Sequence, residues 1–157
     1  QQTDYMCHCR EQKFSLSTPN AALKVYVPHN TIITFKDELM GPQVIDLKKA
    51  AGDFTIQRKD GIPAYHLASV TDDLNCGTTT IVRGEDLLES TAAQIYLAEL
   101  MGYPEFISIR WYHHPLLLDE HGNKMSKSAG STSLRWLRQN GKDANELIDE
   151  LMQQLTN

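Results

Sequence analysis

The sequence has no run of about 18 consecutive apolar residues, which is the length that a membrane-spanning helix needs. Its first ten residues, QQTDYMCHCR, show neither the basic end nor the apolar stretch of a secretory signal. Three cysteines among 157 residues are too few for a disulfide framework, so we expect thiols or metal ligands. These absences argue against a membrane segment and a disulfide-stapled domain. We expect a monomeric protein of the cytoplasm with no membrane partner.

The composition is typical of one soluble domain, because 41% hydrophobic and 22% charged residues suffice for an ordinary core. The formal net charge of -5 argues against indiscriminate binding to nucleic acid. This charge is unevenly spread, since the stretch from His121 to Lys142 holds five basic residues and no acidic one. A solvated basic face and a phosphate-binding surface both fit such a stretch. The chain starts at Gln1 rather than at an initiator methionine, and we expect it to be part of a longer protein.

Glycine and proline residues divide the first half of the chain into short elements. We predict short strands over 25–27 and 31–35, separated by Pro28. Residues 54–58 alternate between apolar and polar, as a half-buried strand does. The sequence Lys59-Asp60-Gly61 that follows is typical of a turn, so this segment is expected to open a hairpin.

From Tyr65 onward, helical and strand patterns alternate. The spacing predicts a helix from Tyr65 that ends at Gly77, a strand over 79–83, a helix over 88–101 and a strand over 107–111. This alternation indicates an α/β layered fold, in which ligands bind at the carboxyl ends of the strands. Arg83 occupies such an end.

The last part of the chain begins with a polar loop over 119–130. Ser133 is predicted to be the N-cap of a short helix, and apolar residues between Leu147 and Leu155 predict a final amphipathic helix. The loop contains Lys124-Met125-Ser126-Lys127-Ser128, in which two lysines flank hydroxyl groups. Such a loop suits phosphate binding, but short Lys/Ser loops are also common solvated surface features.

These five residues match the KMSKS signature of class I aminoacyl-tRNA synthetases without a mismatch. The segment 52–104 and the stretch HHPLLLDEHGNKMSKSAGSTSL resemble glutamyl-tRNA synthetases and the shorter glutamyl-Q tRNA(Asp) synthetases, and the likeness extends over about 25–137. The resemblance implies the carboxyl-terminal part of a class I Rossmann-type catalytic domain, with a small mixed β insertion and terminal helices. Residues 1–52 would be a connecting or insertion segment, and 53–157 the second half of the nucleotide-binding domain.

The resemblance also implies roles for individual residues. Tyr65 and Arg83 would bind glutamate, since a guanidinium suits a carboxylate and a phenol adds a donor. From the residues alone, a core aromatic and a strand-end surface charge are the alternatives. Lys127, assisted by Lys124, would contact ATP, and the ATP site would include Met125 and Ser126. The expected activity is the activation of glutamate with ATP and magnesium, followed by transfer to a tRNA acceptor.

The sequence departs from the family pattern in two places. It contains no HIGH signature, so part of the active site is missing and we expect the 157-residue chain to be inactive alone. Cys7 and Cys9 resemble half of the family's zinc subsite, but the Tyr and third Cys that should follow are absent. Because structural zinc needs four ligands, this count favours a degenerate subsite over an occupied one. If Asn157 is a native end, the short glutamyl-Q type is favoured.

Two other sets of residues could pass for catalytic groups. Asp72-Asp73 is interpreted as a helix cap or surface feature. His113 and His114 are interpreted as structural, because a carboxylate nucleophile needs no proton abstracted. The alternative function is a non-catalytic RNA-binding or interaction module that kept the synthetase fold.

Overall fold

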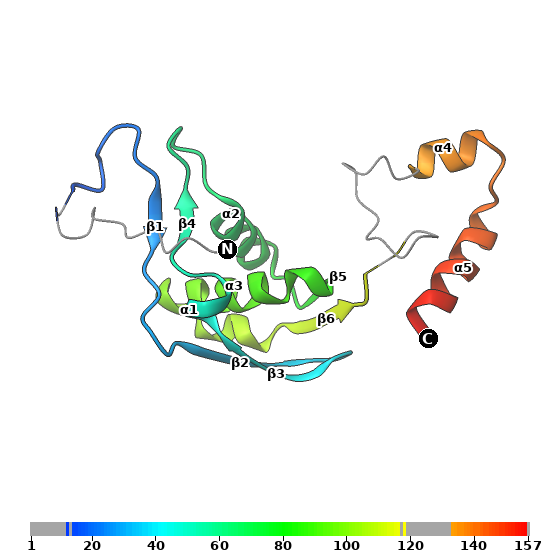
Figure 1. Cartoon of the computed structure of the whole chain (residues 1–157), viewed down its shortest axis with the longest axis horizontal. Helices are drawn as coiled ribbons and strands as arrows, with labels where there is room; N and C mark the ends of the chain where they lie inside the picture. Colours follow the sequence, from blue (N-terminus) through cyan, green and yellow to red (C-terminus); the bar gives the residue numbers. More distant parts are fainter. Residues whose placement is uncertain (1–11, 13, 117, 119–132, 157) are drawn as a thin grey trace. The chain divides into compact units, whose positions relative to one another are not determined.

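The computed structural model describes residues 12, 14–116, 118 and 133–156, with backbone only for 154–156 (Figure 1). Along the chain the elements are β1 (Leu23–Val25), β2 (Ile32–Asp37), β3 (Gly41–Asp46), α1 (Leu47–Ala50), β4 (Phe54–Gln57), α2 (Tyr65–Cys76), β5 (Thr80–Gly84), the 3-10 turn η2 (Glu85–Leu87), α3 (Leu88–Leu100), the 3-10 turn η3 (Pro104–Ser108), β6 (Arg110–His114), α4 (Leu134–Gln139) and α5 (Ala144–Thr156). None of the described helices is long and apolar enough to cross a membrane.

These elements form two compact units whose segments alternate along the chain. The first unit consists of Gln1–Thr34, Val44–Thr78 and Glu89–Ser108. The second consists of Phe35–Gln43, Thr79–Leu88 and Ile109–Asn157.

The first unit contains the antiparallel pair β1 and β4, with Val25 opposite Phe54. Helix α2 contacts β4, and the Phe54 and His66 rings meet edge to face with centroids 5.2 Å apart. The Asp53 carboxylate ties this unit together, because its Oδ1 accepts from the Val27 amide at 3.0 Å and from Lys48 Nζ at 2.6 Å. Helix α3 is buried along most of its length, as its apolar sequence requires.

The four-stranded sheet has the order β3-β2-β6-β5. Strand β6 pairs in parallel with β5 and with β2 (Figure 1). In β2 every second residue, ending with Phe35 and Asp37, is buried, and β6 buries Trp111 and His113 in the same way. This period-two burial shows that one face of the sheet is covered.

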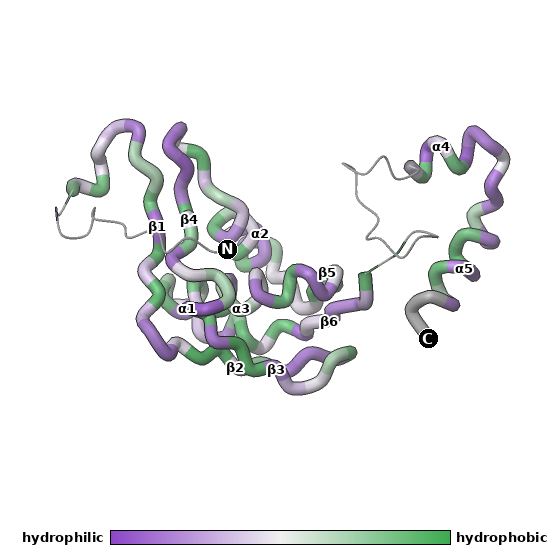
Figure 2. Tube along the Cα trace, viewed as in Figure 1, coloured by the Kyte–Doolittle hydropathy of each residue, from purple (hydrophilic) through white to green (hydrophobic). Residues whose placement is uncertain are grey.

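The second unit also contains the two terminal helices. Ser133 Oγ accepts from the Trp136 amide at 3.1 Å, which caps the start of α4. Hydrophobic and hydrophilic residues alternate along α5 (Figure 2). Lys142, which precedes α5, donates to Glu150 at 2.5 Å and lies 3.9 Å from Glu146. The hydrogen bond to Glu150 and the negative charges of both carboxylates raise the pKa of its ammonium. This cation of the basic stretch is therefore held by acidic neighbours.

The structure confirms the predicted α2 with its Gly77 cap, α3, the Ser133 cap and the parallel strands of an α/β fold. Two strand predictions are wrong in position. The strand predicted at 25–27 is β1, which ends at Val25, and the strand predicted at 107–111 starts only at Arg110. The reason for the second error is that Pro104 begins a 3-10 turn, which takes up the apolar Phe106 and Ile107. After the turn at 59–61 the chain pairs with β4 through the bridge between Gln57 and Pro63, and the Arg58 and Ala64 amides donate to the carbonyls of Ile62 and Ile56.

The cap of α2 generates a test of the local fold. Gly77 has φ 62°, and its amide donates to the carbonyls of Asp73 and Leu74. An L-residue pays a steric cost in this conformation, so we expect Gly77→Ala to lower the free energy of unfolding by about 1 kcal/mol. Urea denaturation measures the change, and Gly77→Asn is the control because Asn tolerates the left-handed region better. An alanine variant as stable as the wild type would contradict this explanation of the helix end.

Candidate active site

The carboxyl ends of the parallel strands β5 and β6 lie next to each other. In their register, Arg83 is opposite His113 and Gly84 is opposite His114. Ligands of α/β proteins bind at this kind of edge, where backbone groups and side chains of neighbouring strands converge. This sheet edge is therefore the candidate active site within the second unit.

Arg83 belongs to the covered face of the sheet. Residues directly opposite each other on paired strands share a face, and so do residues two apart on one strand. The set defined in this way is Phe35, Asp37, Ile81, Arg83, Trp111 and His113. Val82, which points the other way, is exposed, whereas Arg83 is half-buried. The predicted glutamate ligand is thus more enclosed than a strand-end surface charge.

The guanidinium of Arg83 lies over an aromatic ring. Its Cζ is 5.2 Å from the centroid of the fully buried Trp111 side chain. A planar guanidinium stacks well on such a ring, and the contact restricts the directions in which its N–H groups point. Phe35 packs edge-on against Trp111 with centroids 6.3 Å apart, and at the same distance against His113.

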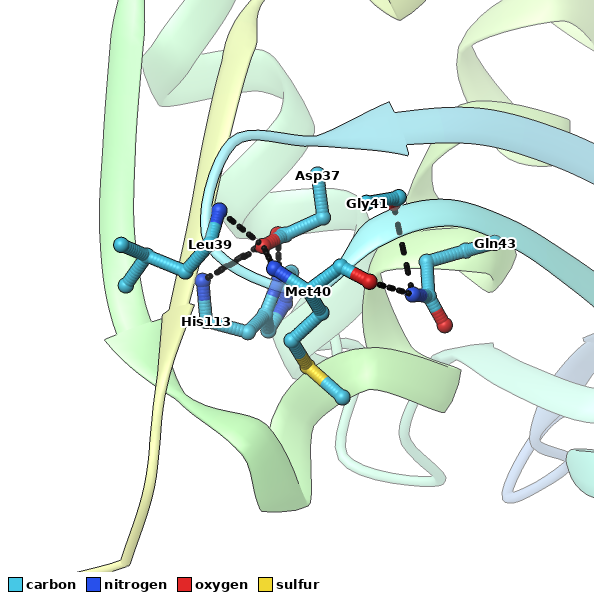
Figure 3. A network of polar contacts seen from close by, with 6 residues as sticks. All are labelled: Asp37, Leu39, Met40, Gly41, Gln43 and His113. Carbon is cyan, nitrogen blue, oxygen red and sulfur yellow. Dashed lines mark hydrogen bonds and ion pairs between the residues drawn. The ribbon is translucent and has the colours of Figure 1, made fainter. Parts of the chain in front are cut away.

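The Asp37 carboxylate lies at the centre of a buried polar network (Figure 3). Its Oδ1 accepts from the amides of Leu39 at 2.9 Å and Met40 at 2.8 Å, in the turn between β2 and β3. Its Oδ2 accepts from the His113 amide at 3.1 Å and from His113 Nδ1 at 2.5 Å. Because a carboxylate only accepts, Nδ1 is the nitrogen that carries the proton. Both side chains are fully buried, so His113 is not placed to take a proton from a substrate.

Two opposing effects set the pKa of Asp37. Burial disfavours the charged carboxylate and raises the pKa. The hydrogen bonds from the His113 side chain and from the amides of Met40, Leu39 and His113 favour the charged form. Together these bonds outweigh burial, and the pKa of Asp37 lies below its ordinary value.

The segments that leave β5 and β6 are tied to each other. A Cβ on Gly84 would lie 2.6 Å from Asp86 Oδ1 and 3.3 Å from Leu116 Cδ2, so a larger residue there would require the Asp86 carboxylate to move. Glu85 Oε1 accepts from the Leu116 amide at 3.3 Å. Residues of the turn after β5 thus hold the start of the segment that leads away from β6.

Tyr65 is the first residue of α2, with 54% of its surface exposed, so it is not a buried core aromatic. Its ring lies 5.5 Å from that of His66. Tyr65 belongs to the first unit and Arg83 to the second, and their shared glutamate pocket stays a prediction.

The remaining predicted site residues, Lys124, Met125, Ser126, Lys127, Cys7 and Cys9, lie outside the described residues. In the part of the chain that the structure describes, no group of three His, Cys, Asp or Glu side chains could hold a metal ion. The Asp72-Asp73 pair lies on α2, where Ser69 Oγ is 3.5 Å from Asp73 Oδ2.

Asp37 and Trp111 are not among the residues that the sequence analysis singled out. A signal for Asp37 was present, since an acidic residue in the buried phase of an alternating strand requires a buried partner. Trp111 carries no comparable signal. Its contact with Arg83 depends on which strands pair and in which register.

Comparisons with known proteins agree with this α/β fold. The family of class I tRNA synthetases (E and Q), catalytic domain, matches residues 4–155. The glutamyl-Q tRNA(Asp) synthetase of Pseudomonas syringae is 44% identical over 118 residues, which are 75% of this chain and 39% of that protein. The enzyme of the same name from Methylococcus capsulatus is 42% identical over 127 residues, or 81% of this chain and 41% of that protein.

Among solved structures, a glutamate tRNA ligase from Elizabethkingia meningosepticum, in complex with its amino acid, superimposes with a TM-score of 0.61. The two sequences are 30% identical, and the matched region covers 78% of this chain and 23% of the ligase chain. The chain belongs to the class I tRNA synthetase (E and Q) catalytic-domain family. It spans about two-fifths of the length of the curated relatives.

The lowered pKa of Asp37 predicts how stability depends on pH. Its stabilising effect is present in full above the unfolded pKa, near 3.8, and is lost as the pH falls through the lower folded pKa. At neutral pH we expect Asp37→Asn to be about 1–3 kcal/mol less stable, since its NH2 group would face the His113 donors. Urea denaturation from neutral to strongly acidic pH should show this difference shrinking with acidity. A difference that stays constant across this range would contradict the assignment.

Proposed function

We propose that the complete protein activates glutamate with ATP and transfers it to tRNA. The observation that carries the proposal is the position of Arg83, half-buried at the carboxyl end of a parallel strand and stacked on Trp111. The family membership of the chain supports it. In this proposal residues 53–157 are the second half of the nucleotide-binding domain, and 1–52 a connecting segment.

Arg83 and Tyr65 act on the amino acid. The guanidinium forms paired hydrogen bonds with a substrate carboxylate, and the phenol of Tyr65 adds an orienting donor. An oxygen of the glutamate α-carboxylate then attacks the α-phosphorus of ATP. The bond from this phosphorus to the bridging oxygen breaks, pyrophosphate leaves with the electron pair, and glutamyl-adenylate forms. No proton is abstracted from the nucleophile, so the step needs no general base. The buried His113 does not act as one.

The lysine motif acts on ATP. Lys127 and Lys124, with Met125 and Ser126 beside them, would place positive charge against phosphate oxygens on which negative charge increases during the attack. Magnesium would accompany the triphosphate. Among the described residues no group of three His, Cys, Asp or Glu side chains could hold a metal ion. The Cys7 and Cys9 pair is proposed to be a degenerate zinc subsite.

The acceptor is proposed to be tRNA(Asp), since the relatives at 44% and 42% identity are glutamyl-Q tRNA(Asp) synthetases. The solved structure of a glutamate tRNA ligase is 30% identical. In the second step a hydroxyl group of the tRNA attacks the glutamyl carbonyl carbon, and AMP leaves. A monomer in the cytoplasm, where tRNA and ATP are available, fits this role.

Arg83 provides the first test of the amino-acid site. We expect Arg83→Ala in the complete protein to raise the KM for glutamate about tenfold to a hundredfold, because charge-assisted hydrogen bonds contribute about 1.5–3 kcal/mol. Glutamate-dependent exchange of pyrophosphate into ATP measures this change. The matched control is Arg110→Ala at the opposite end of the parallel pair, where Arg110 bonds Thr80 Oγ1 at 3.0 Å. Equal effects of the two substitutions would count against a glutamate site at Arg83.

Lys127 provides the test of the ATP site. Loss of one preorganised charge at the transferring phosphoryl group should lower kcat for exchange by roughly 10²–10³-fold in Lys127→Ala. Lys142→Ala removes a lysine of the same basic stretch that is already paired with Glu150, and it should exchange like the wild type. An unaffected Lys127→Ala enzyme would remove the role given to the motif. A complete protein inert with glutamate, yet able to bind tRNA, would instead favour the non-catalytic RNA-binding module.

A further inference from the structure

Asp37 is connected to the strand end that carries Arg83, although it touches no substrate in the proposed reaction. Asp37 joins the turn after β2 to β6, and it does so at His113, the residue directly opposite Arg83 in the register of β5 and β6. Only a carboxylate can accept from both turn amides and from both His113 donors. A neutral amide in this place would set an N–H group against another N–H group.

A second set of contacts connects strand β2 to the guanidinium of Arg83. Phe35, two residues before Asp37 on β2, packs against both His113 and Trp111. Trp111 in turn lies beneath Arg83. A shift of β2 relative to β6 would therefore disturb the packing of Trp111, on which the guanidinium rests, and of His113, the residue opposite Arg83.

We propose that Asp37 and His113 are positioning residues for glutamate binding, which hold Arg83 in the orientation that pairs with the substrate carboxylate. The proposal rests on the proposed function of Arg83. Bidentate binding by a guanidinium depends on the direction of its N–H groups. A misplacement of about 1 Å can cost up to about a hundredfold in rate.

The first experiment compares Asp37→Asn with Asp46→Asn in the complete protein. Asp46 is a second carboxylate that bonds a backbone amide, since it caps α1 through the Lys49 amide, but it lies in the first unit. We expect Asp37→Asn to raise the KM for glutamate about tenfold or more, while the KM for ATP stays within about twofold. Asp46→Asn should leave both constants unchanged. A purely structural loss lowers the folded fraction and the apparent kcat but not the KM, so an unchanged KM for glutamate in Asp37→Asn would overturn the proposal.

The second experiment uses His113, in case Asp37→Asn does not fold. The Nδ2 of asparagine lies as far from the backbone as Nδ1 of histidine, so His113→Asn keeps the donor to Asp37. His113→Leu removes this donor. We expect the leucine variant to show the raised KM for glutamate and the asparagine variant to stay within about threefold of the wild type. Equal glutamate KM values in the two variants would overturn the proposal.

The Arg83→Ala variant separates this inference from the proposed function. If Arg83→Ala raises the KM for glutamate and neither Asp37→Asn nor His113→Leu does so, the positioning role fails and glutamate binding by Arg83 stands. If the wild-type protein shows no glutamate-dependent exchange, the proposed function fails and the positioning role fails with it.

Discussion

The geometry of the four-stranded sheet depends on one buried carboxylate. Asp37 is shielded from solvent, and donors of the turn after β2 and of His113 compensate its charge. A buried charge that loses such donors is strongly destabilising. Moving strand β2 away from β6 would therefore cost a large amount of free energy. The hairpin of β2 and β3, strand β6 and, through its register, strand β5 are therefore positioned together. Arg83 takes its place from this arrangement.

The parts of the fold that could be predicted from the sequence have local physical causes. Gly77 ends α2 because the left-handed conformation favours glycine, and Ser133 starts α4 because its hydroxyl accepts from a nearby amide. Strand β3 has no such local cause. It begins with Gly41-Pro42, which by itself is typical of a turn, and it becomes a strand because it lies at the edge of the sheet beside β2. The predicted start of β6 is too early, because the apolar residues of the preceding 3-10 turn resemble those of a strand.

In the candidate site, too, only the features with local causes could be predicted from the sequence. Arg83 followed from the resemblance carried by the residues around it, and its place at a strand end followed from the alternation of elements. Its aromatic partner Trp111 and the network below it could not be derived, because they depend on the pairing of strands that are distant in the sequence. The amino-acid side of the proposed chemistry thus rests on Arg83 and Tyr65, which the structure describes. The ATP side rests on the motif that contains Lys124 and Lys127.

The hydrogen bond between Asp37 and His113 is open to direct measurement by ¹⁵N NMR of the histidine side chains. With an ionised Asp37 as acceptor, Nδ1 of His113 should carry a proton at neutral pH, and burial should make this proton exchange slowly with water. In Asp37→Asn the slow exchange should be lost. An Nδ1 of His113 without a proton in the wild-type protein would contradict the account, because the carboxylate on which the sheet depends would then have no donor on this side chain.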